Sequence, residues 1–112
     1  MAYSEHLVDR VRQRLSKANI TEEKKMMGGL IFMVNGKICI GVDKVKATGE
    51  DRLMVRVGKA TEEQLMFKNG SREMDFTGRV MRGFLFIPPE GFDSEKDLDF
   101  WTEKALEFNL QL

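Results

Sequence analysis

The stretch that decides the fold is Met26-Met27-Gly28-Gly29-Leu30-Ile31-Phe32-Met33-Val34-Asn35-Gly36-Lys37-Ile38-Cys39-Ile40-Gly41-Val42. Two runs rich in β-branched and aromatic residues flank Asn35-Gly36, a dipeptide that strongly favours a two-residue hairpin turn. Such a turn needs positive φ at both central positions, which asparagine tolerates and glycine adopts freely. The stretch therefore predicts a β-hairpin that turns at residues 35–36.

The turn also sets the register of the two strands, and the register decides which side chains share a face. Counting back from the turn pairs Val34 with Lys37, Phe32 with Cys39 and Leu30 with Gly41. One face then belongs to the core under the helices: Ile31, Met33, Ile38, Ile40 and Val42, joined by Leu53, Val55 and Val57. The opposite face carries a second apolar set with a charged rim: Leu30, Phe32, Val34, Cys39 and Met54, with Lys37, Arg52 and Arg56.

The remaining elements follow from hydrophobic periodicity and from residues that cap helices or form turns. Helices are predicted over about 4–16, 61–67 and 94–110, and further strands over 52–57, near 74 and over 84–87. The polar residues 17–25 are predicted to form a connection into the sheet. The order α-β-β-β-α-β-β-α, with short connections, predicts a two-layer α+β fold in which an antiparallel sheet has its helices on one side.

Length and composition describe one globular domain. The chain has 112 residues, of which 42% are hydrophobic and 32% charged, and its formal net charge is zero. No apolar run approaches the roughly 18 residues of a membrane span, and the N-terminus lacks a signal-peptide pattern. With a single cysteine, Cys39, these features indicate a cytoplasmic protein without an internal disulfide.

The neutral total hides an uneven distribution of charge. Residues 1–60 carry 12 Lys and Arg against 7 Asp and Glu, whereas residues 61–112 carry 6 against 11. Either the two halves interleave and neutralise each other, or the molecule has a charged docking face. Because the chain as a whole lacks a basic excess, its charge does not predict a dedicated nucleic-acid binder.

No residue pattern in the chain predicts catalysis, a cofactor or a metal. Gly36-Lys37 lacks both the first glycine and the hydroxyl residue of a phosphate-binding loop. His6 and Cys39 are the only histidine and the only cysteine, too few for a metal site, and no orienting partner for a Cys–His pair is evident. We therefore expect a non-enzymatic protein without cofactors.

Four stretches carry a family resemblance. Residues 25–37 resemble the "KMFGGxxFMVNGK" hairpin of the N-terminal domain of the TfoX/Sxy competence regulators, and residues 53–58 resemble the strand that follows it. Residues 74–84 are similar to the family's "MDFTGRPMKG" segment, and Trp101 with residues 105–108 resembles its closing helix. In this chain Met27 replaces the usual phenylalanine and Val80 the usual proline.

The resemblance implies a stand-alone domain over residues 1–112, with a two-layer α+β fold related to secretion chaperones and without the regulators' helical C-terminal domain. It also implies a regulatory role exerted through protein contacts rather than by reading DNA. No catalytic residue comes with it.

Two functional hypotheses follow. The first is a cytoplasmic interaction module that presents the face of Leu30, Phe32, Val34 and Cys39 to a protein partner or to a second copy of itself. In its alternative, the segment 74–83 folds over that face and nothing binds there. The second is a small-ligand binder or enzyme with a pocket near residues 74–83, using Asp75, Arg79 and Arg82.

Overall fold

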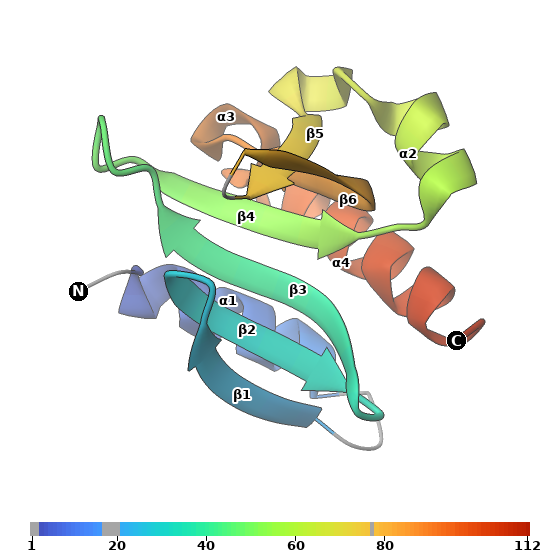
Figure 1. The fold of residues 1–112 in the computed structure, drawn as a ribbon. Coiled ribbons are helices and arrows are strands. Elements are labelled where there is room, and N and C mark those ends of the chain that lie inside the picture. Colours follow the sequence, from blue (N-terminus) through green and yellow to red (C-terminus); the bar gives the residue numbers. More distant parts are fainter. Residues whose placement is uncertain (1–2, 17–20, 77) are drawn as a thin grey trace.

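The fold is a six-stranded antiparallel sheet with helices packed on one side, seen in a computed structural model that describes residues 3–16, 21–76 and 78–112 (Figure 1). The strands are β1 (Thr21–Met26), β2 (Gly29–Val34), β3 (Lys37–Lys44), β4 (Asp51–Arg56), β5 (Arg72–Phe76) and β6 (Arg79–Ile87). Their order across the sheet is β1-β2-β3-β4-β6-β5. The helices are α1 (Glu5–Leu15), α2 (Lys59–Leu65), the 3-10 turn η1 (Lys68–Gly70), α3 (Pro89–Phe92) and α4 (Glu95–Asn109).

The long helices α1 and α4 lie against the same face of the sheet (Figure 1) and cover the main core. Trp101 is fully buried there and donates its indole Nε1–H to the Gly91 carbonyl at 3.0 Å, which holds α3 against α4. At the far end of α4, Asn109 Nδ2 donates to the Val34 carbonyl at 3.0 Å. The predicted α+β class and the placement of helices on one side of the sheet are confirmed.

Local sequence explains where the two long helices begin. The hydroxyls of Ser4 and Ser94 accept hydrogen bonds from the backbone N–H of Leu7 and Asp97, so each serine caps a helix N-terminus. None of the helices in the described ranges is both long and apolar enough to cross a membrane.

Ion pairs tie α1 to α4. The Arg14 Nε lies 2.6 Å from Asp99 Oδ1, and both Arg14 and Arg10 also pair with Glu95. Two basic residues of α1 thus meet two acidic residues at the start of α4, so part of the opposite charge of the two halves is neutralised at this contact.

The hairpin at Asn35-Gly36 forms as predicted, but the predicted register holds only for the two residue pairs next to the turn. Both turn residues have positive φ, 54° and 77°, and Met33 pairs with Ile38. Beyond that pair the register shifts by one residue, so Phe32 pairs with Ile40 and Leu30 with Val42. Cys39 is the extra residue of a β-bulge in β3, a feature that the count from the turn omitted.

A further strand, β1, replaces part of the predicted connection over 17–25; residues 17–20 lie outside the described ranges. β1 pairs with β2 through a second two-residue turn, in which Met27 and Gly28 have φ of 56° and 79°. Every residue of β1 is exposed, since it forms an edge of the sheet. The order of the long elements is therefore α-β-β-β-β-α-β-β-α, one strand more than predicted.

The corrected register predicts that Phe32 is a core residue. Its side chain is 1% exposed beneath the helices, so Phe32→Ala should lower the free energy of unfolding by about 3–5 kcal/mol. The half-exposed Val80 is the control, and Val80→Ala should change stability by no more than about 0.5 kcal/mol. Urea unfolding of both variants measures the effects, and equal stabilities would contradict the register.

The stabilisation that the edge strand β1 gains from the Arg12–Glu23 pair should depend on pH. Arg12 holds the Glu23 carboxylate with two hydrogen bonds, of 2.6 and 2.8 Å, and these lower the pKa of Glu23 below its ordinary value of 4.5. Because the folded-state pKa is lowered, the stabilisation is present above pH 4.5 and is lost as the pH falls through the lowered pKa. The stability difference between wild type and Glu23→Gln should therefore shrink on acidification.

Thermal unfolding at neutral and acidic pH measures that difference. Glu22→Gln is the control for the change in net charge, since its carboxylate lies 3.9 Å from Lys24 on the same exposed strand. A difference that stays constant with pH would rule out the Arg12–Glu23 pair as its source.

Candidate functional site

The residues predicted to form an open interaction surface divide between the two faces of the sheet. Met54 and Arg52 lie on the helix-free face, as predicted, and Arg56 lies beside Phe84 at the end of β4. Lys37 is exposed next to the hairpin turn. The other four residues are buried in the core beneath the helices, so their assignment to an open face was wrong: Leu30, Phe32, Val34 and Cys39.

The bulge at Cys39 is the physical reason for this error. It places Ile40 opposite Phe32, so the alternate residues of β2 that were assigned to the surface turn toward the helices instead. Ile31, Met33 and Ile38, which were assigned to the core, contribute to the cluster on the helix-free face.

We call that second cluster the methionine face. It contains five of the eight methionines of the chain, together with two isoleucines and two phenylalanines. Its members are Met27, Met33, Met54, Met74, Met81, Ile31, Ile38, Phe84 and Phe86. They come from the β1–β2 turn and from β2 to β6, so nearly the whole width of the sheet builds this surface. The segment 74–83 adds Met74 and Met81, as part of the sheet rather than as a loop over it.

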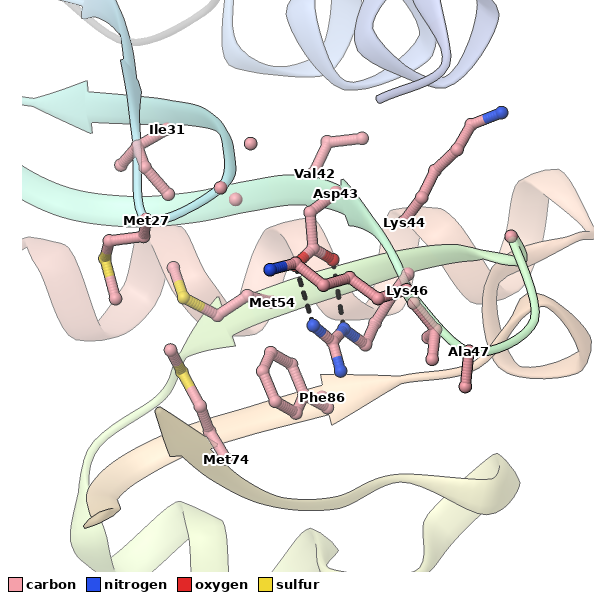
Figure 2. Close-up of a pocket in the computed structure, with 16 residues that line it drawn as sticks. Met27, Ile31, Val42, Asp43, Lys44, Lys46, Ala47, Met54, Met74 and Phe86 are labelled. Atoms are coloured by element: carbon pink, nitrogen blue, oxygen red, sulfur yellow. Dashed lines mark hydrogen bonds and ion pairs between the residues drawn. The ribbon is translucent and has the colours of Figure 1, made fainter. Parts of the chain in front are cut away.

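An open cavity of about 780 Å³ lies on the methionine face. Figure 2 shows Met27, Met54 and Met74 following one another across it, with Phe86 beside them. Gly41 lies at its floor, where a Cβ would come within 2.8 Å of Ile31 Cδ1 and 3.1 Å of Met54 Cε. A residue without a side chain therefore lets two apolar side chains lie across β3.

A bidentate ion pair between Arg52 and Asp43 borders the apolar part of the cavity. Arg52 donates to Asp43 through Nε at 3.0 Å and Nη2 at 2.7 Å, and its guanidinium lies 3.8 Å from the centroid of the Phe86 ring. This bidentate pair satisfies both charges within the domain. In Figure 2 Lys44 points away from the cavity, whereas Lys46 extends back across it. Lys46 has no ion-pair partner among the residues that the structure describes.

The alternative polar site near residues 74–83 does not assemble in one cavity. Asp75 lines a different depression, on the other side of β5, and Arg82 binds Glu62 and Glu63 of α2. Arg79 is exposed at the start of β6. None of the three residues lines the cavity on the methionine face.

Two observations bear on chemistry elsewhere in the domain. Cys39 is buried, and burial raises the pKa of its thiol to about 12, against a smaller opposing effect of Arg56. Among the described residues there is no group of three or more His, Cys, Asp or Glu side chains placed to hold a metal ion.

Comparison of the amino-acid sequence with models of protein families shows which family the chain belongs to. The family model described as the TfoX N-terminal domain matches residues 13–109 of the 112. The chain belongs to this family. Searches of curated proteins and of solved structures found no significant match.

The TfoX N-terminal domain is linked to the regulation of competence. The matched region begins within α1 and ends within α4, so it includes every residue of the methionine face. Sequence reasoning placed only Met54 of that face on the correct side from the β-strand pattern. The high number of methionines is visible in the composition, but the register of β2 and β3 is needed to show that several of them share one face of the sheet.

The buried thiol of Cys39 gives a direct test of the corrected face assignment. Because its pKa is raised to about 12 and its side chain is 1% exposed, native protein at pH 8 should not react with Ellman's reagent over minutes. The same protein in denaturant should react fully and provides the control. Rapid labelling of the native protein would place Cys39 on the surface and contradict the bulge.

Proposed function

We propose that this TfoX N-terminal domain is a non-catalytic interaction module whose methionine face binds an apolar segment of a protein partner. The observation that carries the proposal is the gathering of five methionines on the face without helices. Three of them, Met27, Met54 and Met74, line an open cavity of about 780 Å³. Methionine is unbranched and polarizable, so such a surface can adapt to apolar side chains of different shapes. A regulator that works through protein contacts needs a surface of this kind.

Charge favours an occupant that combines apolar side chains with a carboxylate. The Asp43–Arg52 pair is internally neutral, whereas Lys46 extends across the cavity with no partner among the described residues. An apolar segment with an acidic residue at one end would pack on the methionines and pair with Lys46. A second copy of the same face would instead bring two Lys46 side chains toward each other, which opposes self-association.

Met27 allows a test that does not damage the fold. It lines the cavity, but it also occupies a turn position with φ of 56°, where asparagine is more favourable than methionine. Met27→Asn should therefore keep or raise thermal stability while it removes an apolar contact. Leu110→Asn, at a residue 82% exposed at the end of α4, is the matched control.

The probe is a phage-displayed library of random twelve-residue peptides, selected on the wild-type domain. We expect enrichment of peptides with bulky apolar residues and Asp or Glu, and binding to Met27→Asn about tenfold weaker by fluorescence polarisation. Leu110→Asn should bind as the wild type does.

Three results would contradict this proposal. One is equal binding by Met27→Asn and wild type, and another is selection of peptides without acidic residues. The third is a dimer in sedimentation equilibrium that Met27→Asn dissociates, because the face would then be occupied by a second copy.

A further inference from the structure

The second surface of interest is the outer edge of β5. The sheet ends at this strand, which pairs only with β6 among the described residues. An edge strand leaves a row of backbone N–H and C=O groups available for pairing with another extended chain. The chemistry of this edge therefore already specifies an occupant with an extended backbone.

Side chains on β5 differ between its two faces. Met74 is buried in the methionine face, whereas Glu73 and Asp75, one residue to either side, are exposed on the opposite side of the strand. Both carboxylates line a depression of about 730 Å³ with Met66, Phe67 and Ser71. Within the described ranges neither carboxylate has an ion-pair partner.

Phe67 adds an apolar contact beside these carboxylates. Its side chain is 76% exposed and lines the same depression, and its φ of 75° is unusual for a residue other than glycine. An aromatic side chain held open to solvent next to a free strand edge is the kind of residue that anchors a bound peptide.

The other edge of the sheet lacks these features. β1 carries glutamates and lysines in close succession, a pattern that opposes pairing with further strands. Its Glu23 is bound to Arg12 and its Lys24 lies near Glu22. None of the four main depressions on the described part of the chain is lined by residues 21–26.

We propose that the β5 edge binds an extended segment of a partner protein by β-strand addition, and that the segment carries a basic–apolar–basic alternation. Its two basic side chains pair with Glu73 and Asp75, and the apolar residue between them lies beside Met74 on the methionine face. A further apolar residue of the segment contacts Phe67.

Charge disfavours a second copy of β5 as this occupant. In an antiparallel pairing centred on Met74, Glu73 of each copy would lie opposite Asp75 of the other. A pairing centred on Glu73 would place that carboxylate opposite itself. Like charges directly opposite each other destabilise strand pairing, so the edge favours a basic partner over a copy of itself.

The test uses two synthetic peptides and the full chain. The first peptide is acetyl-Ser-Lys-Val-Arg-Val-Ser-amide, and the second replaces its two basic residues with glutamate. Titration into isotope-labelled protein, followed by NMR, should shift the amide signals of residues 72–76 with the basic peptide only. Binding should weaken as salt is added, because exposed ion pairs are screened.

Charge reversal identifies the acidic residues. The double variant Glu73→Lys/Asp75→Lys should bind the basic peptide at least about tenfold more weakly and should gain binding of the acidic one. Glu5→Lys/Glu103→Lys changes the net charge equally at exposed positions on α1 and α4, and should bind as the wild type does. Phe67→Asn removes the ring at a φ that asparagine tolerates and should weaken binding several-fold.

Backbone methylation of the peptide separates strand addition from simple charge attraction. Alternate N–H groups of an added strand point toward β5, so N-methylation of one alternate set should abolish binding and methylation of the other should not. Equal effects of the two sets, binding of the acidic peptide to wild type, or signal shifts away from residues 72–76 would overturn the proposal. Met27→Asn should leave this interaction intact, so its outcome is separate from that for the methionine face.

Discussion

The β-bulge at Cys39 is the constraint on which the two faces of the sheet depend. In a regular strand Ile38 and Ile40 would share a face, but the extra residue places Ile38 in the methionine face and both Cys39 and Ile40 in the main core. The shift brings Phe32 opposite Ile40 and so under the helices. A hairpin without the bulge would expose the phenylalanine and bury part of the methionine face in its place.

The sequence contains enough information for some strands and too little for others. On β4, Arg52 and Arg56 mark the outward face. The residues that alternate with them, Leu53 and Val55, are therefore correctly predicted to be buried. On β3 the run around Cys39 is apolar or small at every position, so no polar residue shows where the alternation changes phase. β1 has the opposite difficulty, since its exposed polar residues show no apolar alternation and its pairing comes from β2.

The uneven charge of the two halves has a structural explanation. Arg10 and Arg14 of α1, in the basic half, pair with Glu95 and Asp99 of α4, in the acidic half. These contacts bring part of the basic excess of the first half onto part of the acidic excess of the second. Among the described residues, the charges outside such pairs include Lys46 beside the methionine face and the two carboxylates of β5. All three groups lie next to apolar side chains.

Methionine suits the role proposed for this face, which would have to be stable without a partner and still receive one. Ile31 and Met54 are each 4% exposed, so the methionine face already shields its own centre from water. A partner would gain little there by simple burial and would have to rearrange side chains, which costs least where the side chains are unbranched. Met74 lies both in this face and on the edge strand β5. A strand added to that edge would therefore extend the apolar surface, so occupation of the edge would change the shape of the face.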